Sequence, residues 1–345
     1  MTEIFLTIFF ISVLLFFLGT GIWVAISMIG VSSIGMILFT SRPVGDAMAT
    51  TIWGASSSWT LTALPLFVWM GEILFRTKLS ENLFKGLAPW MQKLPGGLIH
   101  VNVVGCALFA AISGSSAATV ATVGKMSIPE LRKRKYPEKI LLGSLAGSGT
   151  LGLLIPPSII LIIYGVTVQE SIAKLFIAGI IPGIMIALIF MSYVIIWSLM
   201  NKKSMPKSLE NSSFIEKVKK SKQLMPVILL ILAVIGSIYT GIATATEAAS
   251  LGVVGALILS FFQRSLTKET FRASLLGATK TSCMIAFILA GATFLSLAMG
   301  FTGLPRNLAI WIQGMELSPY VLIFVLMIFY IILGMFLDGI SAVVL

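Results

Sequence analysis

A run of hydroxyl-bearing and small residues interrupts a long apolar segment at Ser113-Gly114-Ser115-Ser116. The flanking residues of 98–126 are largely apolar, so these hydroxyls and the carbonyls beside the glycine are oxygen ligands at a site with little water. Uncharged oxygens at a break in a membrane helix are suited to a monovalent cation such as Na⁺. The alternative interpretation is that small residues only let two helical arms pack closely.

A second candidate segment, 147–158, combines helix-weakening glycines with a double proline. Proline removes a backbone donor and clashes with the preceding turn, so a helix should break here and free carbonyls for an ion or an anionic group. A merely kinked helix is the alternative. The candidate residues of this segment are Gly147, Gly149, Thr150, Gly152, Pro156, Pro157 and Ser158.

A carboxylate, Asp338, lies deep in the last apolar run, 321–345. An acid in such a run is costly and is therefore a functional candidate. A carboxylate that caps the nearby turn is the alternative.

The elements that must position these residues follow from composition. Of 345 residues, 57% are apolar and 11% are charged, which excludes a soluble enzyme, a disordered scaffold and a collagen-like fibre. The long apolar runs lack strict alternation, so the composition predicts an all-α polytopic membrane protein in the lipid bilayer and no β-barrel. The net charge is +11, and the basic residues are dispersed between these runs. They therefore indicate how the chain is oriented in the membrane, and we expect no nucleic-acid partner.

The apolar runs divide the chain into a first half, a basic linker and a second half. The first half, 1–200, should contain spans 4–18, 21–39 and 61–75, a hairpin over 98–126, a broken helix over 140–166 and a span over 172–200. After the linker, 201–222, the second half covers 223–345, and its hairpin should begin at about 321.

Basic residues predict the orientation of the first hairpin. Of the 24 Lys and Arg residues, 21 lie in four segments, and two of these flank 98–126. By the positive-inside rule all four segments, including 201–222, are cytoplasmic. A segment with cytoplasmic flanks on both sides must enter the membrane and return, so 98–126 is expected to be a re-entrant helical hairpin.

An internal repeat appears at an offset of 225 residues, where Leu79–Leu83 aligns with Leu304–Leu308 and Ser113–Ala117 with Asp338–Ala342. Six identities are weak alone, but the apolar blocks also align. The second hairpin is approached through a segment with Arg306 as its only basic residue, so it should enter from the outside. Two copies in opposite orientation form an inverted repeat. The second copy lacks a counterpart of 147–158, which predicts a C-terminal truncation.

Three interpretations of the chain as an enzyme are rejected on the sequence. The chain has no G-x-x-x-x-G-K-[ST] motif for ATP hydrolysis. The G-x-G-x-x-G at Gly147 is not a dinucleotide-binding motif, because it lacks the preceding strand that such a motif requires. Gly114-Ser115 is close to an intramembrane serine protease motif with His100 as base, but the motif is incomplete and the repeat would be unexplained. We therefore expect no enzyme and no cofactor.

The sequence resembles the large membrane subunit (DctM-like, or M) of TRAP transporters. The resemblance rests on Phe109–Thr119, Gly149–Gly152 with Ile155–Ser158, Gly241–Ala249 and Phe336–Gly339. Ala245 departs from the family, which usually has proline at this position.

The resemblance implies an elevator-type, Na⁺-coupled importer of organic acids, such as C4-dicarboxylates, sialic acid or other sugar acids, in the bacterial inner membrane. Its partners would be a periplasmic substrate-binding protein and a small four-helix membrane subunit. By position, the Na⁺ ligands would be Ser113, Gly114, Ser115, Ser116, Gly149, Thr150, Asp338, Gly339 and Ser341. A stand-alone Na⁺/divalent-anion symporter and a non-transporting scaffold component remain as alternatives.

Overall fold

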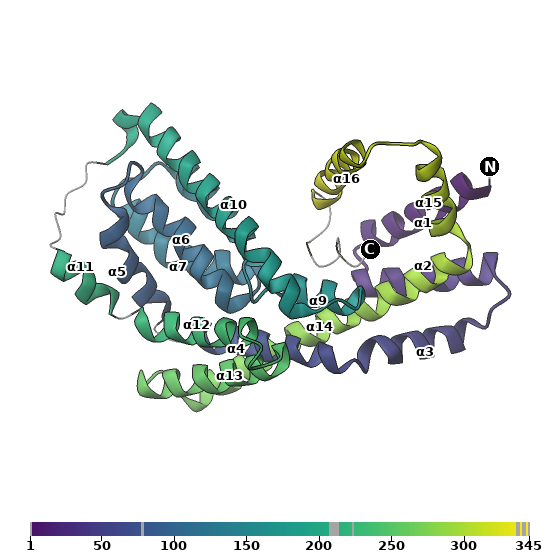
Figure 1. The fold of residues 1–345 in the computed structure, drawn as a ribbon, viewed down its shortest axis with the longest axis horizontal. Coiled ribbons are helices and arrows are strands. Elements are labelled where there is room, and N and C mark those ends of the chain that lie inside the picture. Colours follow the sequence, from purple (N-terminus) through teal and green to yellow (C-terminus); the bar gives the residue numbers. More distant parts are fainter. Residues whose placement is uncertain are drawn as a thin grey trace. The chain divides into compact units, whose positions relative to one another are not determined.

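A computed structural model describes residues 2–76, 79–206, 214–222 and 224–335, together with Gly339 and Val343. Within these residues the regular structure is entirely helical, with sixteen α-helices and four 3₁₀-helices (Figure 1). The all-α prediction is therefore confirmed for the described part of the chain. Asp338 and Ser341 lie outside the described residues.

The chain forms two compact units. The larger comprises Thr62–Thr281, and the smaller combines Met1–Leu61 with Ser282–Leu345. Helix α14 (Lys268–Phe301) contributes residues to both.

The smaller unit is built around the second half of α14. Met36, Phe294 and Ala298 form its buried cluster, and the α14 backbone approaches α2 so closely that a Cβ on Gly291 would lie 2.8 Å from the Ala25 carbonyl oxygen. Its other helices are α1 (Thr2–Gly19), α2 (Val24–Phe39), α3 (Val44–Ser56), α15 (Leu304–Gly314) and α16 (Pro319–Gly334), with most of η1 (Trp59–Thr62).

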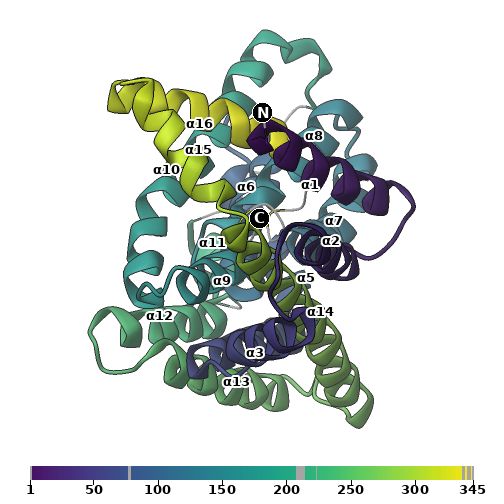
Figure 2. The same cartoon turned by 90° about the vertical axis from the view of Figure 1, so that its right-hand side faces the viewer.

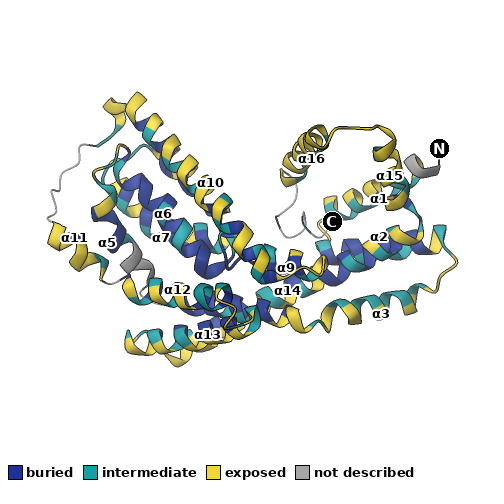
Figure 3. Ribbon diagram, viewed as in Figure 1, coloured by how far each residue is buried: buried dark blue, intermediate teal, exposed yellow. Residues whose placement is uncertain are grey.

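The larger unit has a helical hairpin at its centre, and this hairpin contains its most continuous buried surface (Figure 3). The hairpin arms are α6 (His100–Ser113) and α7 (Ser116–Lys133), and α8 (Glu138–Gly149) packs against both. Around them lie α4 (Ala63–Phe75), α5 (Leu79–Met91), η2 (Gly97–Ile99), η3 (Thr150–Leu153), α9 (Ile159–Thr167), α10 (Ile172–Met200), η4 (Lys202–Ser204), α11 (Phe214–Ser221), α12 (Met225–Tyr239) and α13 (Ala245–Phe262). Helices α12 and α13 run side by side in both views (Figure 2).

Three described helices, α10, α13 and α14, are long and apolar enough to cross a membrane by themselves. Counting each of two bent pairs, α3 with η1–α4 and α11 with α12, as one span raises the number to five. Four further helices are apolar but shorter, α6 with η2 among them. A helix of ten to seventeen residues is typical of a re-entrant or broken segment.

Three helices do not coincide with apolar runs of the sequence. Helix α3 has no apolar run, since Asp46, Gly45 and two threonines interrupt it, and it contains no buried residue. Helix α14 begins at Lys268, well before the apolar run at 281–300. Helix α11 lies within the basic linker 201–222.

The base of the hairpin is closed by Tyr136, whose hydroxyl accepts a hydrogen bond from the amide of Leu98 at 3.1 Å. Burial raises the pKa of Tyr136, and the Leu98 hydrogen bond and the charge of Arg134 oppose this rise.

Since Leu98 is 1% exposed, Tyr136→Phe would leave the Leu98 amide unpaired. We expect a loss of about 1–3 kcal/mol in unfolding free energy, measured as a lower Tm in detergent. An unchanged Tm would show that this hydrogen bond is not required.

Candidate functional site

The tip of the hairpin is a two-residue turn between two helix ends. Helix α6 ends at Ser113, Gly114 follows with φ +57°, and Ser115 is the N-cap of α7. Glycine adopts this left-handed conformation more readily than any residue with a Cβ. The Ser115 hydroxyl accepts a hydrogen bond from the Ala118 amide at 3.4 Å, so the sequence around Gly114 both stops α6 and starts α7.

Three hydroxyl groups gather behind this turn. Ser113 Oγ lies 2.9 Å from Thr119 Oγ1, and Thr119 donates to the Ser115 carbonyl oxygen at 2.7 Å. Ser113 and Thr119 are buried, and Ser115 is half-buried. Thr119 was not among the predicted site residues, although its place four residues after Ser115 on a helix puts it over the tip.

The second candidate segment is a break between two helices. Helix α8 ends at Gly149, η3 follows, and a cis bond joins Pro156 to Pro157 before α9 begins at Ile159. The buried Ser158 donates to the Leu153 carbonyl oxygen at 2.6 Å. The glycines and prolines therefore interrupt the helix where the sequence places them.

The hairpin tip lies directly against this break. A Cβ on Gly114 would be 2.9 Å from the Pro157 carbonyl oxygen, and one on Gly152 would be 3.1 Å from the Ser115 carbonyl. A Cβ on Gly149 would overlap the side chain of Val120 of α7. Glycine is required here because two backbones approach within contact distance.

Four helix ends consequently converge, the C-termini of α6 and α8 and the N-termini of α7 and α9. A helix C-terminus carries roughly −0.5 elementary charge and an N-terminus roughly +0.5. The C-terminal carbonyls favour a cation, and the N-terminal amides favour an anionic group. The arrangement can thus hold both charges without a formally charged side chain.

A cavity of about 320 Å³ opens beside the tip. Its lining includes Ser113, Ser115 and the first turns of α7, and Glu72 of α4 supplies the one carboxylate among its lining residues. That carboxylate accepts hydrogen bonds from Arg76, at 2.9 and 3.1 Å. Glu72 was not among the predicted site residues, and the structure places it on this cavity.

Not every predicted site residue faces the tip. Gly147 packs against Phe190 of α10, with a virtual Cβ at 3.3 Å. Thr150 is exposed, and its hydroxyl donates to the Gly147 carbonyl oxygen at 2.7 Å. Pro156 lies near Gly179 of α10. Gly339 lies in the described part of the chain, but Asp338 and Ser341 do not. The whole predicted ligand set stays a prediction.

The geometry contradicts a catalytic serine at the tip. His100 is the first residue of α6 and Ser113 the last, which separates them by about 20 Å at 1.5 Å per residue. His100 is instead fully buried, with Nε2 at 2.8 Å from the Pro95 carbonyl oxygen. Its imidazole cannot activate Ser115.

The family model "Tripartite ATP-independent periplasmic transporter, DctM component" matches residues 11–345. The C4-dicarboxylate TRAP transporter large permease protein DctM of Pseudomonas aeruginosa is 33% identical over 318 residues, which cover 92% of this chain and 74% of that protein. The sialic acid TRAP transporter large permease protein SiaM of Vibrio cholerae is 32% identical over 331 residues, 95% of this chain and 76% of that protein.

A third relative extends the comparison to a longer protein. The isethionate TRAP transporter permease protein DctMQ of Oleidesulfovibrio alaskensis is 30% identical over 330 residues, which cover 95% of this chain and 51% of that protein. These relatives are permeases and not enzymes. The chain therefore belongs to the DctM family, the large membrane permease component of the tripartite ATP-independent periplasmic (TRAP) transporters.

Proposed function

We propose that this chain is the large permease subunit of a Na⁺-coupled importer of organic acids. The observation that carries the proposal is the meeting of the hairpin tip with the α8–α9 break. The cation would lie at the C-terminal ends of α6 and α8, close to the hydroxyls of Ser113 and Ser115 and to the carbonyls around Gly149. The carboxylate of the substrate would be attracted to the N-terminal ends of α7 and α9.

The order of helices supports an inverted repeat and an elevator motion. Shifting α1–α6 by 225 residues places α1 over α12, α2 over α13, α3 with α4 over α14, α5 over α15 and α6 over α16. The packing also recurs, since Gly252 of α13 lies on Met70 of α4 and Gly291 of α14 lies on Ala25 of α2. In each unit a helix from the first repeat packs on a helix from the second repeat. The two repeats therefore exchange helices between the units.

The side of the membrane follows from the basic residues. Lys93, Lys133–Lys135 and Lys203 come from three separate basic segments, and the structure brings them around one cavity at the base of the hairpin. The positive-inside rule then makes this end cytoplasmic in the bacterial inner membrane. The hairpin tip would face the substrate from within the membrane.

The partners are a small four-helix membrane subunit and a periplasmic binding protein, by analogy with the TRAP relatives. The substrate class is that of the relatives, C4-dicarboxylates, sialic acid and similar organic acids. The acid itself would be selected largely by the binding protein.

Reconstituted uptake tests this function. The chain, reconstituted with a small membrane subunit and a substrate-binding protein of the TRAP type, should accumulate a labelled organic acid in proteoliposomes under an inward Na⁺ gradient. A K⁺ gradient should not replace it. Uptake without the binding protein would favour a stand-alone symporter, and assembly without uptake would favour a scaffold component.

A further inference from the structure

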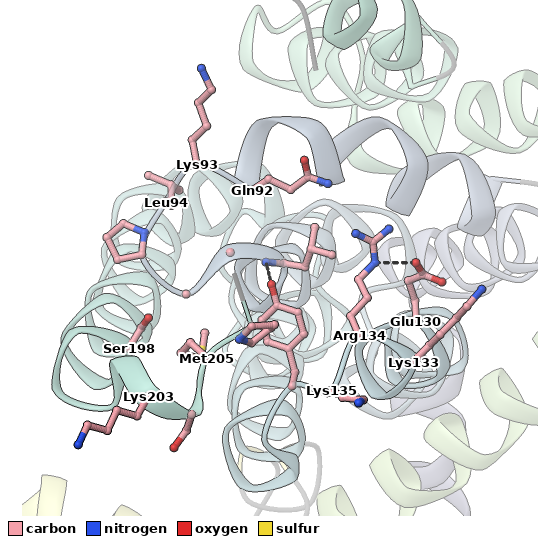
Figure 4. Close-up of a pocket in the computed structure, with 17 residues that line it drawn as sticks. Gln92, Lys93, Leu94, Glu130, Lys133, Arg134, Lys135, Ser198, Lys203 and Met205 are labelled. Carbon is pink, nitrogen blue, oxygen red and sulfur yellow. Dashed lines mark hydrogen bonds and ion pairs between the residues drawn. The ribbon is translucent and has the colours of Figure 1, made fainter. Parts of the chain in front are cut away.

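A second cavity, of about 980 Å³, lies at the base of the hairpin, at the opposite end of α6 from the tip (Figure 4). We refer to it as the basic pocket. Its lining comes from the turn 92–98, from the end of α7 with the following turn, and from the end of α10 with η4. The proposed Na⁺ site includes none of these residues, so the basic pocket needs a separate explanation.

The charge of the basic pocket is strongly positive. Its lining includes one carboxylate, Glu130, which pairs with Arg134 at 2.8 Å. The remaining cations are lysines without a carboxylate partner among the described residues, namely Lys93, Lys133, Lys135 and Lys203. Figure 4 shows them at the rim, around the Leu98–Tyr136 hydrogen bond, and flexible stems let their ammonium groups reach a bound anion.

Part of the lining of the basic pocket is apolar, with Leu94, Leu98 and Met205 among its residues. Ile99, Ile140 and Val194 form a buried cluster that Tyr136 and Trp197 cover. The exposed apolar surface of α10, with Ile196 58% and Met200 79% exposed, lies on the other face of the helix from Ser198, the α10 residue that lines the pocket. Since α10 is long and apolar enough to cross the membrane, this surface faces acyl chains, and Tyr136 and Trp197 lie where aromatic residues mark the membrane–water interface.

We propose that the basic pocket binds the phosphodiester headgroup of an anionic phospholipid of the cytoplasmic leaflet, with the acyl chains along α10. The combination of unpaired lysines, an aromatic residue in the lining and an adjacent lipid-facing helix fits this ligand. A soluble anion would use the lysines but would leave the apolar part of the lining, Leu94, Leu98 and Met205, without a role. Placing the pocket in the cytoplasmic leaflet rests on the proposed membrane orientation, whereas lipid binding does not depend on Na⁺ coupling.

Thermal unfolding in neutral detergent tests the proposal. Phosphatidylglycerol should raise the Tm by about 5 °C near saturation, and phosphatidylcholine or inorganic phosphate at the same phosphate concentration should not. In the variant Lys133→Gln/Lys135→Asn/Lys203→Gln the rise should disappear. Asparagine is chosen at Lys135 because the backbone there has φ +59°.

A matched control removes three lysines outside the pocket. Lys219→Gln/Lys220→Gln/Lys222→Gln, in and just after α11, should keep the full rise in Tm. Ser204→Trp, which fills the lining without changing charge, should lose it if the headgroup enters the pocket. Native mass spectra should show retained phosphatidylglycerol in the wild type and in the α11 variant only. Equal stabilisation by phosphate, or an undiminished rise in both pocket variants, would overturn the proposal.

Discussion

We expect Gly114→Ala to abolish Na⁺-driven uptake. An alanine at φ +57° is strained, and its Cβ would lie 2.9 Å from the Pro157 carbonyl oxygen and 3.0 Å from the Ile159 amide nitrogen. Because both contacts are backbone atoms, neither can move aside without shifting the tip from the α8–α9 break. The strain costs about 1–3 kcal/mol, and a shift of about 1 Å at a binding site can cost two orders of magnitude in rate. Uptake in proteoliposomes measures the loss.

Gly143→Ala provides the matched control in the same unit. Gly143 lies within α8, is exposed, and has no atom within 4 Å of a virtual Cβ. Alanine should be tolerated there and should favour the helix by up to about 1 kcal/mol. If Gly114→Ala transported at the rate of Gly143→Ala, the close contact between tip and break would not be needed for function.

We expect Ser113→Ala to raise the Na⁺ concentration for half-maximal uptake by about 10- to 100-fold. The proposal makes Ser113 Oγ a ligand of the cation, and a bond to a charged group contributes about 1.5–3 kcal/mol. The fold should persist, since Thr119 keeps its hydrogen bond to the Ser115 carbonyl oxygen. Uptake rate against Na⁺ concentration, at constant ionic strength, measures the change.

The control for this prediction is Ser237→Ala. Ser237 lies in α12, and its hydroxyl donates to the Val234 carbonyl oxygen within the same helix. Its loss should leave the Na⁺ dependence unchanged. An identical Na⁺ curve for Ser113→Ala and the wild type would remove Ser113 from the proposed site.

Sequence reasoning located the candidate segments because their signals are local. Gly114 lies between two apolar arms, and Pro156-Pro157 follows three glycines. These residues determine the local backbone conformation whatever surrounds them. The structure places a turn at the first and a helix break at the second. Long apolar stretches such as 172–200 likewise correspond to a helix, Ile172–Met200.

What the sequence did not reveal depends on contacts between distant elements. Helix α3 lacks an apolar run, and the start of α14 carries charged residues that remain exposed on a helix. The proximity of Gly152 to Ser115, and of Glu72 to the tip cavity, follows from packing between separate helices. Thr119 could have been found, because helical spacing places it one turn from Ser115.

Equilibrium binding of ²²Na⁺ to the purified chain tests the central claim most directly. We predict saturable binding that unlabelled Na⁺ displaces and K⁺ does not, retained in Gly143→Ala and lost in Gly114→Ala. Because binding requires neither the substrate nor the partner subunits, it isolates the hairpin tip and the helix break. Absence of saturable binding, equal competition by K⁺, or unchanged binding in Gly114→Ala would contradict the account.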